Sequence, residues 1–404
     1  MARRIGLRRT GSHSGEHVDT ARRNLLKAAG LLVADLLIEK PLRGIEPSLA
    51  VSPGNKVILL ISGGVRFAET FSPEGIVNIP NLSAALAPKA LFYPHMRNEG
   101  VTSHFNATSS ILTGNWQRVD DWGKTPAVSP TIFELLRRER SLSQKDTWII
   151  SSNKALTSNV GASSVSGFGP RYGANTIFPK KLLISAVETA ILQGRGQSLA
   201  DKAKAQAEIA GILNGSNYEG LGWNVFDAST NLDPGVRAMI LDAVAELVHQ
   251  DSPITGDELT HLIAIEVMRR FAPSLLVVSF SDVEAAHFGA YSLHLSGIHN
   301  LDRLAGGLWQ EAETNPAYRG RTTMIIVPEF GRDPNGSRTN GFFNHRSNTD
   351  SCRDTWMMCL GEGVTSPRNV ERPIHHVDIC PTIAAILGCK ATDVAGTTLS
   401  ELSL

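Results

Sequence analysis

The sequence predicts an α/β fold in which a mainly parallel sheet is flanked by helices on both faces. Its candidate strands, among them residues 56–62 and 323–327, are continuous apolar runs without alternation, as is typical of strands covered on both faces. Strand-like and helix-like segments also alternate along the chain of 404 residues, which favours parallel pairing. We expect one large α/β domain over residues 51–404.

Local signals place the individual elements. Ser129 is expected to cap a helix with Pro130 in its first turn, and this helix should reach residue 140. Asp378 and Gly388 mark the cap and the stop of the last helix. Further strands are expected at residues 147–151, 274–280 and 355–360, and further helices at residues 258–271, 291–313 and 381–387.

The middle of the chain reads as an insertion. Residues 152–180 are rich in Gly, Ser and Asn and show no periodicity, whereas residues 182–192, 197–213 and 234–249 have the spacing of amphipathic helices. We expect the stretch from about 152 to 250 to be a helical insertion over the sheet, not a separate domain.

Composition excludes several kinds of partner. Lys and Arg together number 39, as do Asp and Glu, so the chain offers no electrostatic case for nucleic acid or for an acidic membrane surface. No apolar run approaches the roughly 20 residues of a membrane-spanning helix, so we expect no integral membrane segment after processing. If the chain binds an anion, it must therefore do so through a few residues at one site and not through its overall charge.

Residues 1–50 have the pattern of an export signal. Basic residues precede a short apolar run at 28–38, and within them the segment 21–27 (ARRNLLK) resembles the twin-arginine signal. Residues 48–50 (SLA) suit cleavage. An amphipathic N-terminal helix is the alternative, which Asp35 inside the apolar run favours. We expect a folded protein exported to the periplasm.

The cysteines leave two interpretations open. They include no CxxC pair and have no histidine at zinc-finger spacing, which argues against a structural zinc site. In an oxidising periplasm they could form disulfides, or they could be buried free thiols. All fall near the end of the chain, at Cys352, Cys359, Cys380 and Cys389.

Polar side chains follow three candidate strands at their carboxyl ends, where open α/β sheets place their sites. Two imidazoles with one or two carboxylates suit a divalent metal, with zinc as the best fit and iron or manganese as alternatives. Each residue alone is more often an ordinary loop residue, but together they favour a metal site. They are Arg66 after the first strand, Asp282, Glu284 and His287 after the second, and Glu329, Arg332 and His345 after the third.

Several segments in chain order resemble the alkaline phosphatase/sulfatase superfamily, over most of the chain after residue 55. This resemblance implies an alkaline phosphatase-like fold and metal-dependent hydrolysis of a small anionic phosphate or sulfate ester. The segments are VILLISGG, SSILTG, VVSFSDVEAAHFG, IIVPEFGRD and FFNH, followed by HHVDICPTIAAILG, which looks like the terminal helix of that family.

The chain departs from the family pattern in one half of the metal centre. Gly63 or Gly64 stands where the family has its first metal-binding Asp, and Glu329 begins Glu-Phe-Gly where the family has Asp-His-Gly. His104 stands at the position of the nucleophile. The resemblance therefore implies one retained metal and makes a second doubtful. The retained ligands would be Asp282 or Glu284, His287 and His345.

The same departures resemble one branch of the superfamily. Its members are often exported with a twin-arginine signal and carry Gly-Gly after the first strand, Ser-His-Phe as at residues 103–105, and Glu-Phe-Gly-Arg as at residues 329–332. This branch is a domain of unknown function. The resemblance therefore implies a fold more firmly than a reaction.

Two hypotheses for the function remain. In the first, Arg66 or Arg332 clamps the anion and His104 acts as general base or covalent nucleophile, with Thr102 and Ser103 as weaker candidates. Loss of a second metal then predicts modest activity. In the second, the chain is a non-catalytic relative that binds a ligand or a periplasmic partner. Metal content and turnover distinguish the two.

Overall fold

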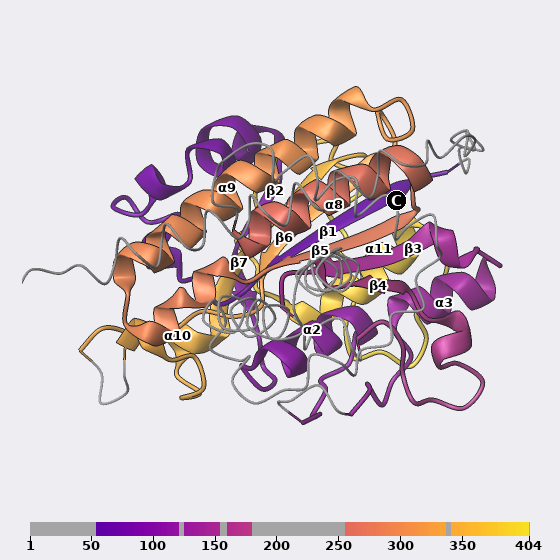
Figure 1. Ribbon diagram of the computed structural model, residues 1–404, viewed down its shortest axis with the longest axis horizontal. Coiled ribbons are helices and arrows are strands. Elements are labelled where there is room, and N and C mark those ends of the chain that lie inside the picture. Colours follow the sequence, from indigo (N-terminus) through magenta and orange to yellow (C-terminus); the bar gives the residue numbers. More distant parts are fainter. Residues whose placement is uncertain (1–53, 121–124, 154–159, 180–254, 337–340, 404) are drawn as a thin grey trace, which may run out of the picture.

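The computed structural model describes residues 54–120, 125–153, 160–179, 255–336 and 341–403. The expected signal segment at residues 1–50 and the expected helices between residues 182 and 249 lie outside the described residues. The described residues form one sheet between two layers of helices, as Figure 1 shows.

The sheet is mixed but mostly parallel, which confirms the expected fold class. Its strand order is β4-β3-β5-β1-β6-β7-β2-β8, and β9 also pairs with β2. The central strand β1 is parallel to both neighbours, whereas β7 is antiparallel to β6 and β2. The strands are β1 (Lys56–Ser62), β2 (Leu91–Arg97), β3 (Thr147–Ser151), β4 (Asn175–Ile177), β5 (Leu275–Phe280), β6 (Thr322–Pro328), β7 (Asp354–Gly361), β8 (Arg368–Asn369) and β9 (Ile374–His375).

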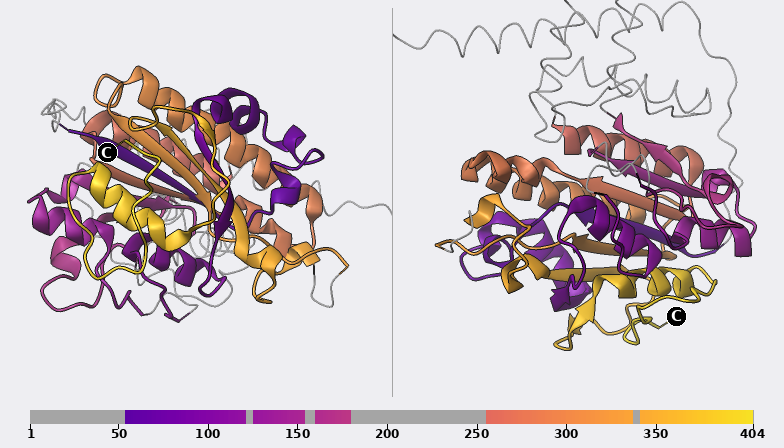
Figure 2. Two further views of the ribbon diagram at one scale, coloured as in Figure 1. Left: turned by 180° about the vertical axis from the view of Figure 1, so that it is seen from behind. Right: turned by 90° about the horizontal axis from the view of Figure 1, so that it is seen from below.

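Helices cover both faces because successive side chains of the central strands point to opposite sides. Ile58 and Leu60 of β1 pack in the core under α8 and α9, and Leu59 and Ile61 pack in the core under α2, α3 and α11. Figure 2 shows these layers from below. The helices are α2 (His104–Thr113), α3 (Ile132–Glu139), α8 (Gly256–Phe271), α9 (Tyr291–Thr314), α10 (Asp350–Arg353) and α11 (Ile379–Ile386).

Four strands were not expected from the sequence: β2, β4 and the two-residue strands β8 and β9. Pro94 lies inside β2, and the register of β2 against β7 shifts between Tyr93 and Met96, so the ladder accommodates a residue that has no N–H. β4 lies in the range expected to be a helical insertion and pairs with β3. The sheet therefore extends into part of that range.

The caps of two helices differ in detail from the expected ones. The cap of α3 is Thr131 rather than Ser129, and Thr131 forms a reciprocal capping box with Glu134. Asp378 does stand at the cap position of α11, but its side chain makes no cap bond there. It accepts a hydrogen bond from the Thr397 N–H at 2.8 Å instead.

The four cysteines are all free thiols in the structure, so of the two interpretations it shows the unpaired one. Burial raises the pKa of the Cys359 thiol to about 12, which keeps this thiol protonated and inert. Among the described helices, none combines the length and the hydropathy that crossing a membrane requires.

Candidate metal centre

The exits of three neighbouring strands meet at one rim of the sheet. β5, β1 and β6 lie side by side in parallel, so their carboxyl ends open in the same direction. β5 leads into the 3-10 helix η9 (Asp282–Phe288), β1 into Gly63, and β6 into Glu329. The first turn of α2 also lies at this rim, where the His104 ring contacts both the Glu284 and the Glu329 carboxylates.

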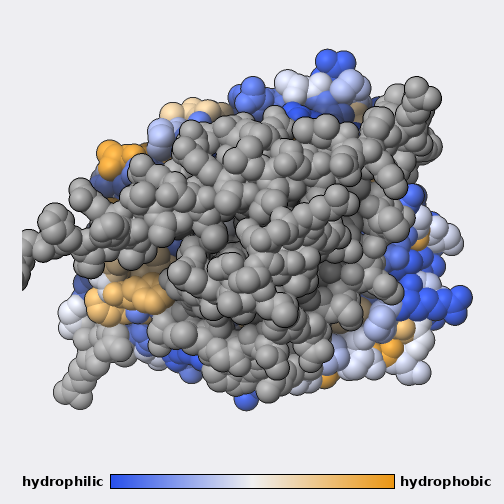
Figure 3. Space-filling model, viewed as in Figure 1, coloured by the Kyte–Doolittle hydropathy of each residue, from blue (hydrophilic) through white to orange (hydrophobic). Residues whose placement is uncertain are grey.

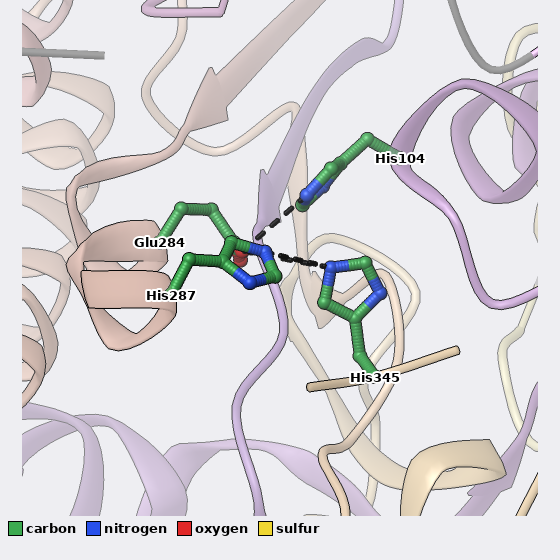
Figure 4. Close-up of side chains that lie close together, drawn as sticks. All are labelled: His104, Glu284, His287 and His345. Carbon is green, nitrogen blue, oxygen red and sulfur yellow. Dashed lines mark hydrogen bonds and ion pairs between the residues drawn. The ribbon is translucent and has the colours of Figure 1, made fainter. Parts of the chain in front are cut away.

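Four side chains at this rim form a group that could hold a metal ion. His104 is the first residue of α2, Glu284 and His287 come from η9, and His345 follows the short helix η10 (Gly341–Phe343). One nitrogen or oxygen atom of each lies within 4.8 Å of the others. Figure 4 shows the four side chains converging from these separate segments. We call them the four-donor group.

The distances within the four-donor group fit a tetrahedral centre. Oε2 of Glu284 lies 3.0 Å from Nε2 of His287, 3.3 Å from Nε2 of His104 and 3.7 Å from Nε2 of His345. Ligand atoms about 2 Å from a tetrahedral zinc ion lie about 3.3 Å from one another. The donor set of three imidazoles and one carboxylate also suits a borderline metal.

Hydrogen-bond directions assign a bare nitrogen to His345, one of the four donors. Nδ1 of His345 lies 2.7 Å from the Thr102 carbonyl, which can only accept, so Nδ1 carries the hydrogen. Burial, together with the nearby His104, holds the pKa of His345 well below its ordinary value, so the ring is neutral and Nε2 has a bare lone pair. That nitrogen lies 3.0 Å from Nε2 of His287 and 3.7 Å from the buried Oε2 of Glu284, which accepts no well-formed hydrogen bond among the described residues. A cation would satisfy both atoms.

The other oxygen of Glu284 is fully engaged by the protein. Oε1 accepts a hydrogen bond from the Gly64 N–H at 2.8 Å and pairs with Nη2 of Arg332 at 2.6 Å. Burial raises the pKa of this carboxyl, but Arg332 and His104 outweigh burial and hold the pKa well below its ordinary value. A Cβ at Gly63 would overlap with Oε1. The glycine pair therefore lets an ionised carboxylate approach the backbone.

The segment after β6 supports the four-donor group from behind. Oε2 of Glu329 lies 2.5 Å from Nδ1 of His104, and Oε1 accepts the Thr108 hydroxyl hydrogen. Burial raises the pKa of Glu329, and the His104 ring and the Thr108 hydroxyl oppose that rise. With Glu329 ionised, Nδ1 of His104 donates to it, and a metal would take the place of a proton on Nε2. The Phe330 ring stacks on His345 with centroids 4.3 Å apart. Carboxylate–histidine pairs of this kind fix ligands in metal centres.

The structure places Asp282 outside the four-donor group. Its Oδ2 accepts the Asp257 N–H at 3.3 Å, and its own N–H donates to Asp257 Oδ2 at 2.9 Å, so it faces the start of α8. The sequence left Asp282 and Glu284 as alternatives, and geometry selects Glu284. Glu329, expected as a ligand, contacts His104 instead and is not one of the four donors.

Neither arginine expected to clamp an anion is free to do so. Arg66 pairs with Glu69 through Nε and Nη2, and its Nη1 donates to the Asp333 carbonyl at 2.8 Å. Arg332 is completely buried between Glu284 and the Gly64 carbonyl, which accepts from Nε at 2.7 Å. Both charges are used inside the protein.

Sequence reasoning treated His104 as a base or nucleophile, whereas the structure places its ring in the four-donor group. The available signals were its hydroxyl-rich segment and its match to the family's nucleophile position, neither of which reveals the direction of a ring. The supporting groups, the Thr102 carbonyl and the Thr108 hydroxyl, were missed because ordinary loop and helix residues carry them. These roles depend on tertiary contacts.

Comparisons with known proteins identify similar folds. A protein of the alkaline phosphatase superfamily from Vibrio parahaemolyticus is 13% identical, with 96% of this chain and 79% of that chain covered and a TM-score of 0.51. Alkaline phosphatase PafA is 10% identical, with 87% and 99% covered and a TM-score of 0.53. The phosphonate monoester hydrolase of Agrobacterium radiobacter is 14% identical, with 85% and 76% covered and a TM-score of 0.51. No family model and no curated protein matches the chain. These likenesses show an alkaline phosphatase-like fold.

Proposed function

We propose that this chain belongs to the alkaline phosphatase superfamily and hydrolyses small phosphate or sulfate esters with a single divalent cation, for which zinc fits best. One observation carries the proposal: three imidazole nitrogens surround the buried Oε2 of Glu284, which accepts no well-formed hydrogen bond within the part of the chain that the structure describes. Two proteins of similar fold are named as an alkaline phosphatase and a phosphonate monoester hydrolase, which supports ester hydrolysis.

Some residues of the chain would bind such a cation directly, and another would orient a ligand. Nε2 of His104, Nε2 of His287, Nε2 of His345 and Oε2 of Glu284 would be its ligands. The Thr102 carbonyl fixes the tautomer of His345. When bound, the cation supplies Lewis-acid polarisation of an ester oxygen.

Arg332 would replace the second cation of a two-metal centre. Its guanidinium balances the charge of Glu284 from the side opposite the imidazoles and holds the Gly64 carbonyl, so the carboxylate stays ionised without a second metal. We infer from this altered centre that activity is modest or directed at easier esters. Arg332 is the arginine of the Glu-Phe-Gly-Arg motif by which the sequence resembles one branch of the superfamily.

Exposed apolar residues lie within six positions of His287 or His345 in the sequence and suit the alcohol part of an ester. Phe288, Tyr291, Leu293 and Phe343 are large hydrophobic side chains that remain exposed. In Figure 3 hydrophobic surface is visible on the left, where α9 begins in the same view in Figure 1. Aryl esters are therefore suitable first substrates.

Metal content and turnover test the proposal together. Purified protein loaded with zinc should hold about one zinc per chain, as a group of four ligands requires, and should hydrolyse 4-nitrophenyl phosphate or 4-nitrophenyl sulfate. His287→Ala should lose both properties, whereas His299→Ala, at an exposed histidine of α9, should keep both. Iron- and manganese-loaded samples test the alternative metals. A metal-free chain without turnover would support the non-catalytic hypothesis and refute ours.

We also propose export to the periplasm through a twin-arginine signal, on the pattern of residues 1–50 alone. Fusion of this segment to a fluorescent protein that folds before export should direct fluorescence to the periplasm of a bacterial host. Replacing Arg22 and Arg23 with lysine should retain the fusion in the cytoplasm. Equal export of both fusions would refute the proposal.

A further inference from the structure

A cavity with a strongly basic lining lies beside the four-donor group. Its volume is about 280 Å³. Thr102, one of its lining residues, accepts a hydrogen bond from His345, and Arg346, another, follows His345 in the chain. The lining therefore includes the residue that follows His345 and the residue that accepts its hydrogen bond. We call it the arginine cavity, and its lining consists of Glu99, Gly100, Val101, Thr102, Arg118, Arg346, Asn348 and Arg353.

One arginine of this cavity is rigidly held. Nη1 of Arg353 donates to the Asn98 carbonyl at 3.1 Å, and Nη2 donates to Oδ1 of Asn348 at 3.0 Å. The acid of the lining, Glu99, lies 3.5 Å from Arg353 but also accepts a hydrogen bond from Arg97 at 2.7 Å. Glu99 is thus shared between two guanidinium groups, and its charge does not neutralise the cavity.

The other two arginines reach the cavity from separate segments. Arg118 is exposed and, within the parts of the chain that the structure describes, makes no hydrogen bond or ion pair. Arg346 is exposed on the loop that carries His345 and has an interaction partner of its own, so an anion would share its guanidinium group. Guanidinium groups bind carboxylate, sulfate and phosphate oxygens through paired hydrogen bonds, so several of them around one cavity favour an anion.

We propose that the arginine cavity binds a second anionic group on the alcohol part of the substrate while the ester group lies at the four-donor group. This inference rests on the proposed function and narrows its substrate class to esters with two separated anionic groups. The cavity is slightly below the usual volume of a pocket for a whole small ligand, roughly 300 to 1,000 Å³. It therefore suits one anionic group and the ring or short chain that carries it.

The kinetic experiment compares two esters that differ in this group alone. With zinc-loaded enzyme, KM is measured for 3-carboxyphenyl phosphate and for 3-methylphenyl phosphate. Arg118→Gln/Arg346→Gln should raise KM for the carboxylated ester at least about tenfold, as expected for lost charge-assisted hydrogen bonds. It should leave kcat, and KM for the methylated ester, nearly unchanged. An equal rise of KM for both esters would overturn the proposal.

A control variant carries the same change in net charge elsewhere. Arg319 and Arg321 directly precede β6, at the edge of the sheet opposite the strand exits. Arg319→Gln/Arg321→Gln should leave both KM values unchanged. If it reproduces the effect, general attraction between protein and anion explains the data and the cavity does not.

A binding experiment separates this inference from the proposed function. Calorimetry of the zinc-free protein with benzoate and with the uncharged benzamide requires no turnover. The wild-type chain should bind benzoate more tightly than benzamide, and the Arg118→Gln/Arg346→Gln variant should lose that preference. If neither ester is hydrolysed but the preference is present, the proposed function fails and the anion cavity stands. Without any preference the cavity proposal fails, whatever the activity.

Discussion

The two oxygens of Glu284 lie in opposite surroundings, although they belong to one carboxylate. Oε1 has a backbone N–H and a guanidinium as partners, so the protein alone completes its environment. Oε2 faces three imidazole nitrogens and accepts no well-formed hydrogen bond among the described residues. A buried anionic oxygen in this state costs free energy unless a cation satisfies it. The difference separates a half of the centre that the protein completes from a half that could take a cation.

The largest expected effect comes from the half that the protein completes. Arg332→Leu leaves Glu284 buried without its counterion, and we expect a loss of about 3 to 5 kcal/mol in the free energy of unfolding. Urea unfolding measures it. Arg303→Leu removes an ion pair with Glu258 that is largely exposed, and should cost at most about 1 kcal/mol. Adding Glu284→Leu to Arg332→Leu should recover part of the loss, and no recovery would contradict the pairing.

The second effect concerns the half that could take a cation. Zinc at 100 times its dissociation constant should stabilise the wild-type chain by about 2.7 kcal/mol, because it binds the folded state alone. Glu284→Gln should abolish this stabilisation, and His299→Ala should retain it. Unfolding in zinc and in a chelator provides the measurement. Equal stabilisation of Glu284→Gln would show that zinc binds elsewhere.

A smaller effect is expected from the support behind the donors. Glu329→Gln removes the negative partner of Nδ1 of His104, and we expect zinc affinity to fall about 10- to 100-fold. Competition with a fluorescent chelator gives the affinity. Glu313→Gln, at an exposed residue of α9, is the control and should change nothing. An unchanged affinity in Glu329→Gln would mean that His104 is not a ligand.

The smallest expected effect concerns a buried histidine outside the four-donor group. His294 resembles His345, because its Nδ1 lies 2.8 Å from the Val283 carbonyl, but it is not one of the four donors. Burial lowers the pKa of His294 to about 4, so the unfolded chain binds the proton first as the pH falls.

The contribution of His294 to stability should therefore be complete above about pH 6.5 and decline toward pH 4, by at most about 1.4 kcal/mol per pH unit. Unfolding of wild-type and His294→Gln proteins in zinc-free buffer between pH 4 and pH 7 measures this decline as a difference. Zinc affinity at pH 7 should be the same in both. A difference that does not depend on pH would contradict the assignment.

Much of the sheet was predictable because its central strands are buried on both faces. The runs at Lys56–Ser62 and Thr147–Ser151 were placed with their observed ends, since hydrophobic burial alone defines them. β2 was not predicted, because proline is disfavoured inside a strand and Pro94 lies within it. Only the antiparallel contact with β7 shows how the register accommodates Pro94. In β2, pairing with β7 outweighs the low strand propensity of proline.

The candidate centre was predictable in its position but not in its assignments. Strand exits indicated the rim, and Glu284, His287 and His345 do meet there. Asp282 and Glu284 are two residues apart in one helical turn, and which of them faces the histidines depends on the path of η9. Arg332 looked like a clamp for a substrate because a sequence does not show that an arginine will be buried against an internal carboxylate.

The four donors come from three segments that are far apart along the chain, at His104, at Glu284 with His287, and at His345. A cation bound by all of them would act as a cross-link that closes long loops, which is the arrangement that restricts an unfolded chain most. None of these loops can close before β5, β1 and β6 have assembled. Uptake of the cation would therefore be a late event in folding, and its rate would report when the central strands have come together.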